Sequence, residues 1–235
     1  MADVPRPSLS ELADLHGSDK GTIGPTPNWA GHLYTPVYER YLAHRRDEPI
    51  ALLEIGIGAG RAKIRRGRNR EGGASLKMWR DYFPRARIYG LDMFDASHLD
   101  DGRVRTFRGD QSDLDCLAAV VAQTGPLDVI VDDGSHRAMH QQTTLGFLFE
   151  HLSPGGLYFI EDLLPNGRGD KMNGPIATDQ ILNTRTVLKG RYAKPNVLPP
   201  GFPAVKAAFH CPREDAEGEM LAVLHKPDGA EKPDS

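Results

Sequence analysis

The sequence predicts an α/β fold in which helices cover both faces of a doubly wound, mostly parallel sheet. Short apolar runs recur along the chain and alternate with stretches whose apolar residues are spaced as in a helix, which is the pattern of consecutive strand and helix units. The runs at Ala51–Ile55 and Leu127–Val131 are apolar at four of five positions. Such continuous runs are typical of parallel strands that are buried on both faces.

The composition indicates one domain with one substantial core. The chain has 235 residues, 39% of them hydrophobic, and a net charge of -3, so neither a nucleic-acid nor a membrane partner is expected. No apolar run approaches the ~20 residues of a membrane span, and residues 1–21 contain no signal-peptide apolar segment. We therefore expect a cytoplasmic protein. Cys116 and Cys211 are too few for a disulfide framework and are expected to be reduced packing residues.

The chain before the first strand is expected to be a helical segment that packs on the core. Residues 1–9 hold few apolar side chains and are expected to fray. A short helix from Leu12 leads into the polar loop HGSDKG at 16–21, and residues 35–44 show helical spacing. The N-terminal segment is expected at 1–48, the main domain at 49–228 and a disordered tail at 229–235. The segment and the main domain are expected to form a single domain.

The main domain is expected to alternate strands with helices. The expected strands are Ala51–Ile55, Ala86–Leu91, Val104–Arg108, Leu127–Val131, Gly156–Ile160, Ala204–His210 and Met220–Leu224. The expected helices run from Ser75 to Tyr82, from Ser112 or Asp113 to Val121, from Arg137 to His151, and near Ala177–Leu188. The last two strands are joined by a charged turn and can form a hairpin, which would make the last strand antiparallel.

Two strands of this expected sheet end in acidic residues. One ends in DDGSH at 132–136, and the next, one crossover later, ends in Glu161 and Asp162. Ligands of open α/β sheets bind beyond the carboxyl ends of the strands, so all four carboxylates are expected at the functional edge. Each cluster alone can be a turn, with Asp133 or Ser135 capping the next helix. Together the carboxylates would repel one another unless a cation lies between them, and an all-oxygen set suits Mg²⁺.

His136 follows the first acidic pair and can act as a general base. The unperturbed pKa of imidazole, about 6.5, suits proton removal near neutral pH. The structural alternative is a histidine at a helix start that is satisfied by the backbone. A third interpretation pairs His136 with His140, at i, i+4 spacing, as zinc ligands, although the remaining ligands would then all be carboxylates.

A glycine-rich loop, GIGAG at 56–60, follows the first strand. Its spacing does not match the dinucleotide fingerprint G-x-G-x-x-G, and no Gly-Lys-Ser/Thr of a P-loop follows. S-adenosylmethionine has no pyrophosphate, carries two cationic groups and a ribose diol, and fits better. Its partners would be Glu54, Asp92 and Asp110, at or beside the ends of three strands. The basic run RAKIRRGRNR at 61–70 is either a solvated loop or a phosphate-binding patch.

Several motifs together resemble a known family. LLEIGIG, GGASLKMWRDYFPRARIYGLDMFD, GDQSD, IVDDGSH and LSPGGLYFIEDL, preceded by HGSDKG and H-x-Y, are similar to those of the metal-dependent sugar O-methyltransferases of antibiotic biosynthesis, of the mycinamicin and tylosin deoxysugar type. The similarity runs from about Leu12 to Leu163. It implies a class I methyltransferase fold, which is a doubly wound Rossmann-like sheet, with S-adenosylmethionine as donor, Mg²⁺ at the active site and a homo-oligomer. The basic run at 61–70 departs from the family pattern.

The resemblance also implies roles for individual residues. Asp133, Glu161 and Asp162 would be the metal ligands, and His136 would be the catalytic base. The residues expected around the donor are Glu54, Gly56, Gly58, Ser75, Asp92, Asp110, Gln111, Ser112 and Asp133.

The expected reaction is methyl transfer to a sugar hydroxyl of a glycosylated natural product. Mg²⁺ would chelate two neighbouring sugar oxygens while His136 removes a proton. One alternative is a catechol or phenol O-methyltransferase, although Pro165–Pro175 contains no aromatic residue for the acceptor. Another is a non-catalytic S-adenosylmethionine-binding protein, against which the intact base and metal positions argue. The Gly- and Pro-rich segment Leu163–Pro175 is expected to be a lid on the acceptor side.

Overall fold

The computed structural model describes residues 5–24, 30–60, 71–163, 207–212 and 220–228, with 178, 182, 198 and 202. The strands are β1 (Ala51–Ile55), β2 (Arg87–Asp92), β3 (Val104–Arg108), β4 (Leu127–Asp132), β5 (Leu152–Leu163), β6 (Ala207–His210) and β7 (Met220–His225). The helices are α1 (Leu9–His16), α2 (Thr35–Leu42), α4 (Ala74–Tyr82), α5 (Leu114–Thr124) and α6 (Ala138–Leu148), with 3-10 turns η1 (Ala43–Arg45), η2 (Ser97–Leu99) and η3 (Phe149–His151).

The strands form a seven-stranded sheet in the order β3-β2-β1-β4-β5-β7-β6. Strands β1 to β5 are parallel, and β7 runs antiparallel to both of its neighbours, β5 and β6. This confirms the expected doubly wound, mostly parallel sheet with an antiparallel last strand. The order of the strands reverses between β1 and β4, and such a switch point is where open α/β sheets bind ligands.

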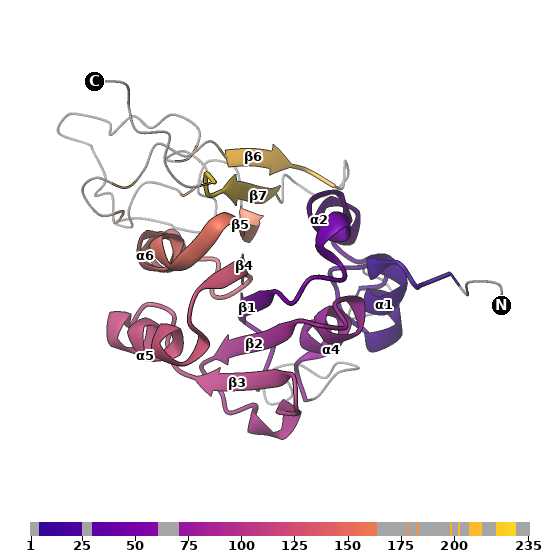
Figure 1. Ribbon diagram of the computed structural model, residues 1–235, viewed down its shortest axis with the longest axis horizontal. Helices are drawn as coiled ribbons and strands as arrows, with labels where there is room; N and C mark the ends of the chain where they lie inside the picture. Colours follow the sequence, from indigo (N-terminus) through magenta and orange to yellow (C-terminus); the bar gives the residue numbers. More distant parts are fainter. Residues whose placement is uncertain are drawn as a thin grey trace.

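Helices cover both faces of the sheet (Figure 1): α1, α2 and α4 lie on one face, and α5 and α6 on the other. The core is divided in the same way. Along β4, Val129 and Val131 pack into the cluster on the first face, whereas Ile130 packs into the cluster on the second. This alternation follows from the period of two in a strand and explains why the run is apolar throughout its centre.

The N-terminal segment packs on the core, as expected, but it is ordered from an earlier residue. Helix α1 begins at Leu9, because Ser8 and Glu11 form a capping box, and Leu9 is fully buried. The expectation that residues 1–9 fray is therefore wrong for Ser8 and Leu9. The helix stops at Gly17, whose left-handed backbone (φ 73°) turns the chain into HGSDKG.

Other boundaries differ slightly. Strand β5 begins at Leu152 rather than Gly156, and Asp113 is the residue that caps α5. The basic run at 61–70, the lid segment after Leu163, most of the helix expected at 177–188 and the tail at 229–235 lie outside the described residues. None of the helices in the described ranges combines the length and apolar character needed to cross a membrane.

Candidate active site

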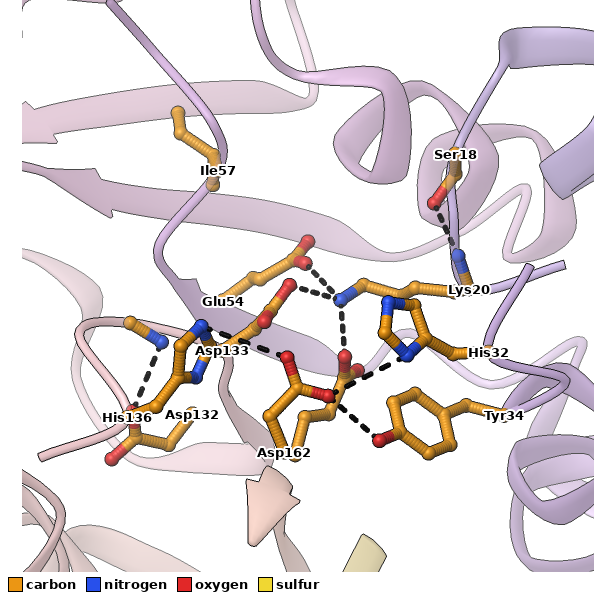
Figure 2. Close-up of polar contacts among 12 residues, drawn as sticks. Ser18, Lys20, His32, Tyr34, Glu54, Ile57, Asp132, Asp133, His136 and Asp162 are labelled. Carbon is orange, nitrogen blue, oxygen red and sulfur yellow. Dashed lines mark hydrogen bonds and ion pairs between the residues drawn. The ribbon is translucent and has the colours of Figure 1, made fainter. Parts of the chain in front are cut away.

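The carboxyl ends of β1, β4 and β5 lie side by side at the switch point of the sheet. The register pairs Ile55 of β1 with Asp132 of β4, and Asp132 with Ile160 of β5. The residues that follow these positions therefore meet at one edge. Figure 2 shows that Glu54, Asp133, His136 and Asp162 approach one another there, beside Lys20, His32 and Tyr34 from the N-terminal segment.

Asp133, His136 and Asp162 form what we call the outer cluster. One potential metal-ligand atom from each lies within 4.8 Å of the others, and all three residues are partly exposed. The His136 Nε2 is 3.6 Å from the Asp162 Oδ2, whereas its Nδ1 is buried without a hydrogen-bond partner in the described structure. The cluster therefore combines two acidic ligands with an imidazole, as a metal site with a neighbouring base requires.

The orientation of Asp162 is fixed by the N-terminal segment. The Tyr34 hydroxyl donates a 2.7 Å hydrogen bond to the Asp162 Oδ1, and the His32 Nδ1 lies 3.7 Å from the same oxygen. The rings of His32 and Tyr34 stack with centroids 5.3 Å apart. Burial raises the pKa of Tyr34, and the negative charge of Asp162 raises it further, so the phenol stays protonated and remains a donor.

Backbone strain is concentrated at this site. Within the described ranges, the non-glycine residues with positive φ are Leu33 (58°), His136 (58°) and Asp162 (52°). Leu33 lies between the two residues that contact Asp162, and the other two belong to the outer cluster. Left-handed conformations cost free energy for such residues and persist only where surrounding contacts hold them, as is common at functional sites.

Lys20, Glu54, Asp133 and Glu161 form a second group, the inner cluster. The Lys20 Nζ donates to the Asp133 Oδ2 at 2.5 Å and to the Glu161 Oε2 at 2.8 Å, and it forms an ion pair with the Glu54 Oε1 at 3.2 Å. The lysine is 1% exposed. Burial alone would lower the pKa of Lys20, but the three carboxylates raise it well above its usual value, so the ammonium stays charged.

The inner cluster engages Glu161, one of the expected metal ligands. Its Oε2 accepts from Lys20, and its Oε1 accepts a very short hydrogen bond from the Tyr38 hydroxyl. Burial and then the charge of Asp133 raise the pKa of Glu161. Burial also raises the pKa of Asp133 to about 6, although Lys20 opposes that shift. Asp133 belongs to both clusters, because only its Oδ2 contacts Lys20.

Asp132 is not part of this site. It is 1% exposed and accepts hydrogen bonds from the Thr144 Oγ1 (2.6 Å) and the Gln111 Nε2 (3.2 Å). Successive strand residues point to opposite faces, so Asp132 is directed toward α6 whereas Asp133 is not. The expectation that all four carboxylates would meet at this edge is wrong for Asp132. Burial of the Asp132 carboxyl raises its pKa.

The glycine loop lies directly against the DDGSH segment. Gly56 has φ 83°, and a Cβ at this position would lie 2.1 Å from the Asp133 carbonyl oxygen. Gly58 also has positive φ, 70°. The Asp92 Oδ2 accepts from the backbone amides of Ile57 (3.2 Å) and Ala59 (3.1 Å) and so braces the loop in addition to its expected role at the donor.

The remaining donor-side residues fall into two groups. Gln111 is buried and accepts from the Ser135 amide at 2.7 Å, which braces the DDGSH segment. Asp110 is more exposed and accepts from both the amide and the hydroxyl of Ser112 at 2.8 Å. Ser75 is buried in the first turn of α4. Glu54 is fully buried, and its Oε2 accepts from the Trp79 Nε1 at 3.0 Å.

The alternative interpretations of the DDGSH segment receive little support. The N-cap of α6 is Arg137, without a side-chain cap, although the Ser135 hydroxyl accepts from its amide at 3.4 Å. The His140 Nδ1 lies 2.8 Å from that same hydroxyl, and the metal-suited group found among the described residues includes His136 but not His140. This does not support a zinc pair.

Four site residues were not predicted from the pattern of the main domain: Lys20, His32, Tyr34 and Tyr38. They precede the first strand and contact partners more than a hundred positions away, such as Asp133 for Lys20. The motifs HGSDKG and H-x-Y, which contribute to the resemblance, contain Lys20, His32 and Tyr34, whereas Tyr38 lies outside both motifs.

Comparison with curated proteins identifies several relatives, whereas no family model matches. The mycinamicin VI 2''-O-methyltransferase of Micromonospora griseorubida is 41% identical over 159 residues, which are 67% of this chain and 36% of the relative. The 8-demethyl-8-(2-methoxy-alpha-L-rhamnosyl)-tetracenomycin-C 3'-O-methyltransferase of Streptomyces olivaceus is 44% identical over 155 residues, 66% of this chain and 36% of the relative. The demethylmacrocin O-methyltransferase of Streptomyces fradiae is 42% identical over 67% of this chain. The match thus spans little more than a third of each relative.

Solved structures agree with these relatives. The MycE methyltransferase of the mycinamycin biosynthetic pathway, in complex with Mg, SAH and mycinamycin VI, superposes with a TM-score of 0.68 at 30% identity, over 96% of this chain and 55% of that one. A second structure of MycE with Mg and SAH gives a TM-score of 0.70 at 31% identity, over 97% of this chain and 56% of that one. The chain is therefore a homologue of the sugar O-methyltransferases of macrolide and tetracenomycin biosynthesis, and its fold is that of the class I methyltransferases.

Proposed function

We propose that the chain is an S-adenosylmethionine- and Mg²⁺-dependent O-methyltransferase that acts on a sugar hydroxyl of a glycosylated natural product. The observation that carries the proposal is the outer cluster, in which Asp133, Asp162 and His136 converge beside the glycine loop. Relatives of this chain are named as methyltransferases of glycosylated macrolides and tetracenomycins, which also supports the proposal. The proposal includes a homo-oligomer, as the resemblance implies, and a small-molecule acceptor rather than a nucleic acid.

The chemistry of the outer cluster suits a hard divalent cation. Asp133 and Asp162 would hold it, with Glu161 as the third ligand that the resemblance implies, because Mg²⁺ prefers oxygen ligands. When bound, Mg²⁺ would lower the pKa of a coordinated hydroxyl and fix its direction. Lys20 contacts only the Oδ2 of Asp133, and Tyr34 only the Oδ1 of Asp162, so these two carboxylates each keep an oxygen for this purpose. Both oxygens of Glu161 already accept hydrogen bonds, from Lys20 and Tyr38, so Glu161 would have to release one of them to bind the metal.

His136 would then be left to move a proton. Its imidazole is one-third exposed and lies beside Asp162, which can stabilise the imidazolium that forms. The hydroxyl proton would pass to His136 while the oxygen takes the methyl group from the donor sulfur and the sulfur keeps the electron pair of the broken bond. The strained backbone of His136 would keep the ring aimed at the acceptor rather than at solvent.

The donor would lie over the loop after β1. Gly56 and Gly58 permit a close approach of its backbone, and Asp92, at the end of β2, would accept hydrogen bonds from the ribose hydroxyls. Ser75, Asp110, Gln111 and Ser112 would complete the donor side.

The proposal is tested by incubating the purified chain with S-adenosylmethionine, Mg²⁺ and a panel of glycosylated macrolides and aromatic polyketides. Mass spectrometry of the products should show the gain of one methyl group on a sugar, and His136→Ala should serve as the inactive control. Simple catechols are included to test the phenol alternative. Calorimetric binding of the donor without transfer to any acceptor would instead favour a binding protein.

A further inference from the structure

Two cation positions adjoin at the carboxyl ends of β4 and β5, and one is already filled by the chain itself. The inner position holds the Lys20 Nζ, at 2.5 Å from Asp133, 2.8 Å from Glu161 and 3.2 Å from Glu54. The outer position is bounded by Asp133, His136 and Asp162. Asp133 is shared, with its Oδ2 turned to the lysine (Figure 2).

We propose that Lys20 is a cation built into the site, whose ammonium permanently fills the inner position. The site therefore binds a single divalent cation, in the outer position, and Lys20 holds the neighbouring carboxylates in place. Lys20 is thus a positioning residue. The proposal rests on the proposed function in one respect, namely that the outer cluster binds a divalent metal.

The balance of charge requires a resident cation. Three carboxylates, from Glu54, Asp133 and Glu161, lie around the Lys20 ammonium, and a fourth, from Asp162, lies next to Asp133 in the outer cluster. Carboxylates this close repel one another strongly, and two of them, on Glu54 and Glu161, are buried within 2% exposure. Within the described part of the chain, Lys20 is the basic residue that forms ion pairs with Glu54 and Glu161. Without its charge, ionised carboxylates would need either protons or an incoming metal ion.

The ammonium of Lys20 has no capacity left for a ligand. It donates two hydrogen bonds, to Asp133 and Glu161, and its third neighbour is the Glu54 Oε1, with which it forms an ion pair. Its side chain is 1% exposed, so neither solvent nor an acceptor reaches it. Lys20 therefore differs from a substrate-binding or nucleophilic lysine, which needs an accessible or uncharged nitrogen.

The backbone around Lys20 is fixed independently of its side chain. The Lys20 carbonyl accepts from the Thr35 amide at 3.1 Å, and the Asp19 carbonyl accepts from the His32 amide at 2.7 Å. A Cβ on Gly31 would lie 2.1 Å from the Gly21 carbonyl oxygen, so the two segments are in direct contact. A neutral side chain at position 20 should therefore leave the loop in place and change only the charge in the inner position.

The test uses the chain of 235 residues, with MnCl₂ as the probe, and does not depend on turnover. Lys20→Met keeps an unbranched side chain that is one atom shorter and removes its charge. Lys20→Met/Glu54→Gln removes one positive and one negative charge, so it restores the balance of charge without changing an expected metal ligand. The glutamine can still accept the hydrogen bond from Trp79. For each variant, the melting temperature is measured without metal, and Mn²⁺ stoichiometry is measured by calorimetry and electron paramagnetic resonance.

Wild type should bind one Mn²⁺ per chain. Metal-free Lys20→Met should melt about 10 °C lower, the effect of leaving a buried ion pair without one partner in a chain of this size. It should bind two Mn²⁺, whose spins are coupled through the shared Asp133, and regain stability when it does so. The double variant should recover most of the melting temperature and bind one Mn²⁺.

Two Mn²⁺ on wild type, or one Mn²⁺ and an unchanged melting temperature in Lys20→Met, would overturn the proposal. If Lys20→Met does not fold without metal, the double variant decides, because a folded double variant supports the charge role and an unfolded one refutes it. Wild type that binds no Mn²⁺ would contradict the metal in the proposed function, whereas the metal-free melting temperatures would still decide the role of Lys20.

Discussion

Gly56→Ala is expected to be among the most damaging small substitutions near the site. Gly56 has φ 83°, and an added Cβ would lie 2.1 Å from the Asp133 carbonyl oxygen and 2.6 Å from the Gly134 Cα. Neither backbone can move easily, because the Gly56 amide donates to Leu91 at 2.8 Å and the Asp133 amide donates to Ile55 at 2.9 Å. The substitution therefore combines a strained backbone with a clash between two fixed segments.

Three other glycines separate these two effects. Gly17 has φ 73° with open space around it, so Gly17→Ala reports strain alone, about 1 to 2 kcal/mol. Gly31→Ala meets a backbone oxygen at 2.1 Å without positive φ and reports the clash, about 1 to 3 kcal/mol. Gly102→Ala has neither problem and should be near neutral. The sum predicts that Gly56→Ala lowers the free energy of unfolding by about 2 to 5 kcal/mol.

The assay is urea unfolding of the four variants beside wild type, with donor affinity measured by calorimetry on those that fold. Gly56→Ala should lose more stability than Gly17→Ala and also bind the donor less tightly, because the displaced loop is the expected donor surface. The reasoning would be refuted if Gly56→Ala were as stable as Gly102→Ala.

Three further outcomes follow from the proposed function. EDTA should abolish turnover and Mg²⁺ should restore it, and full activity in EDTA would contradict the metal role. His136→Ala should keep donor and metal binding, measured by calorimetry, but its rate should fall by roughly 10²- to 10⁴-fold. Asp92→Ala should lower donor affinity at least about tenfold, because it removes a charge-assisted contact and a brace of the glycine loop; unchanged affinity would mean that the donor lies elsewhere. Limited proteolysis should cut within Leu163–Pro175 in the free enzyme and less readily with acceptor bound, and equal cleavage would argue against a lid.

The strands of the sheet could be predicted from sequence because each is a local signal. Ala51–Ile55 and Val104–Arg108 have the expected bounds, and the direction of the last strand followed from the turn before it. The predicted strand Gly156–Ile160 is shorter than β5, because Ser153-Pro154-Gly155-Gly156 resembles a helix stop. In the structure the Gly155 amide donates to the Lys226 carbonyl, which continues the sheet through these residues.

The orientation of polar side chains was harder to predict. Asp132 and Asp133 are adjacent acids, and only the pleat of β4 decides that the first meets Thr144 whereas the second meets Lys20. Glu54 is expected at the donor side, and the sequence did not show that its carboxylate also contacts Trp79 and Lys20. Such choices depend on tertiary contacts between separate elements, up to the 113 positions between Lys20 and Asp133, which no local spacing records.

The contribution of the N-terminal segment bears on how this chain can be recombined with its relatives. The chain before residue 49 supplies the lysine, one histidine and two tyrosines that hold Asp133, Glu161 and Asp162. A chimaera with its crossover near residue 48 would keep a sheet and a glycine loop, yet it would separate the acids from the side chains that orient them. A graft of the site onto another scaffold must therefore carry the chain from the cap of α1 at Ser8 as well as β4 and β5.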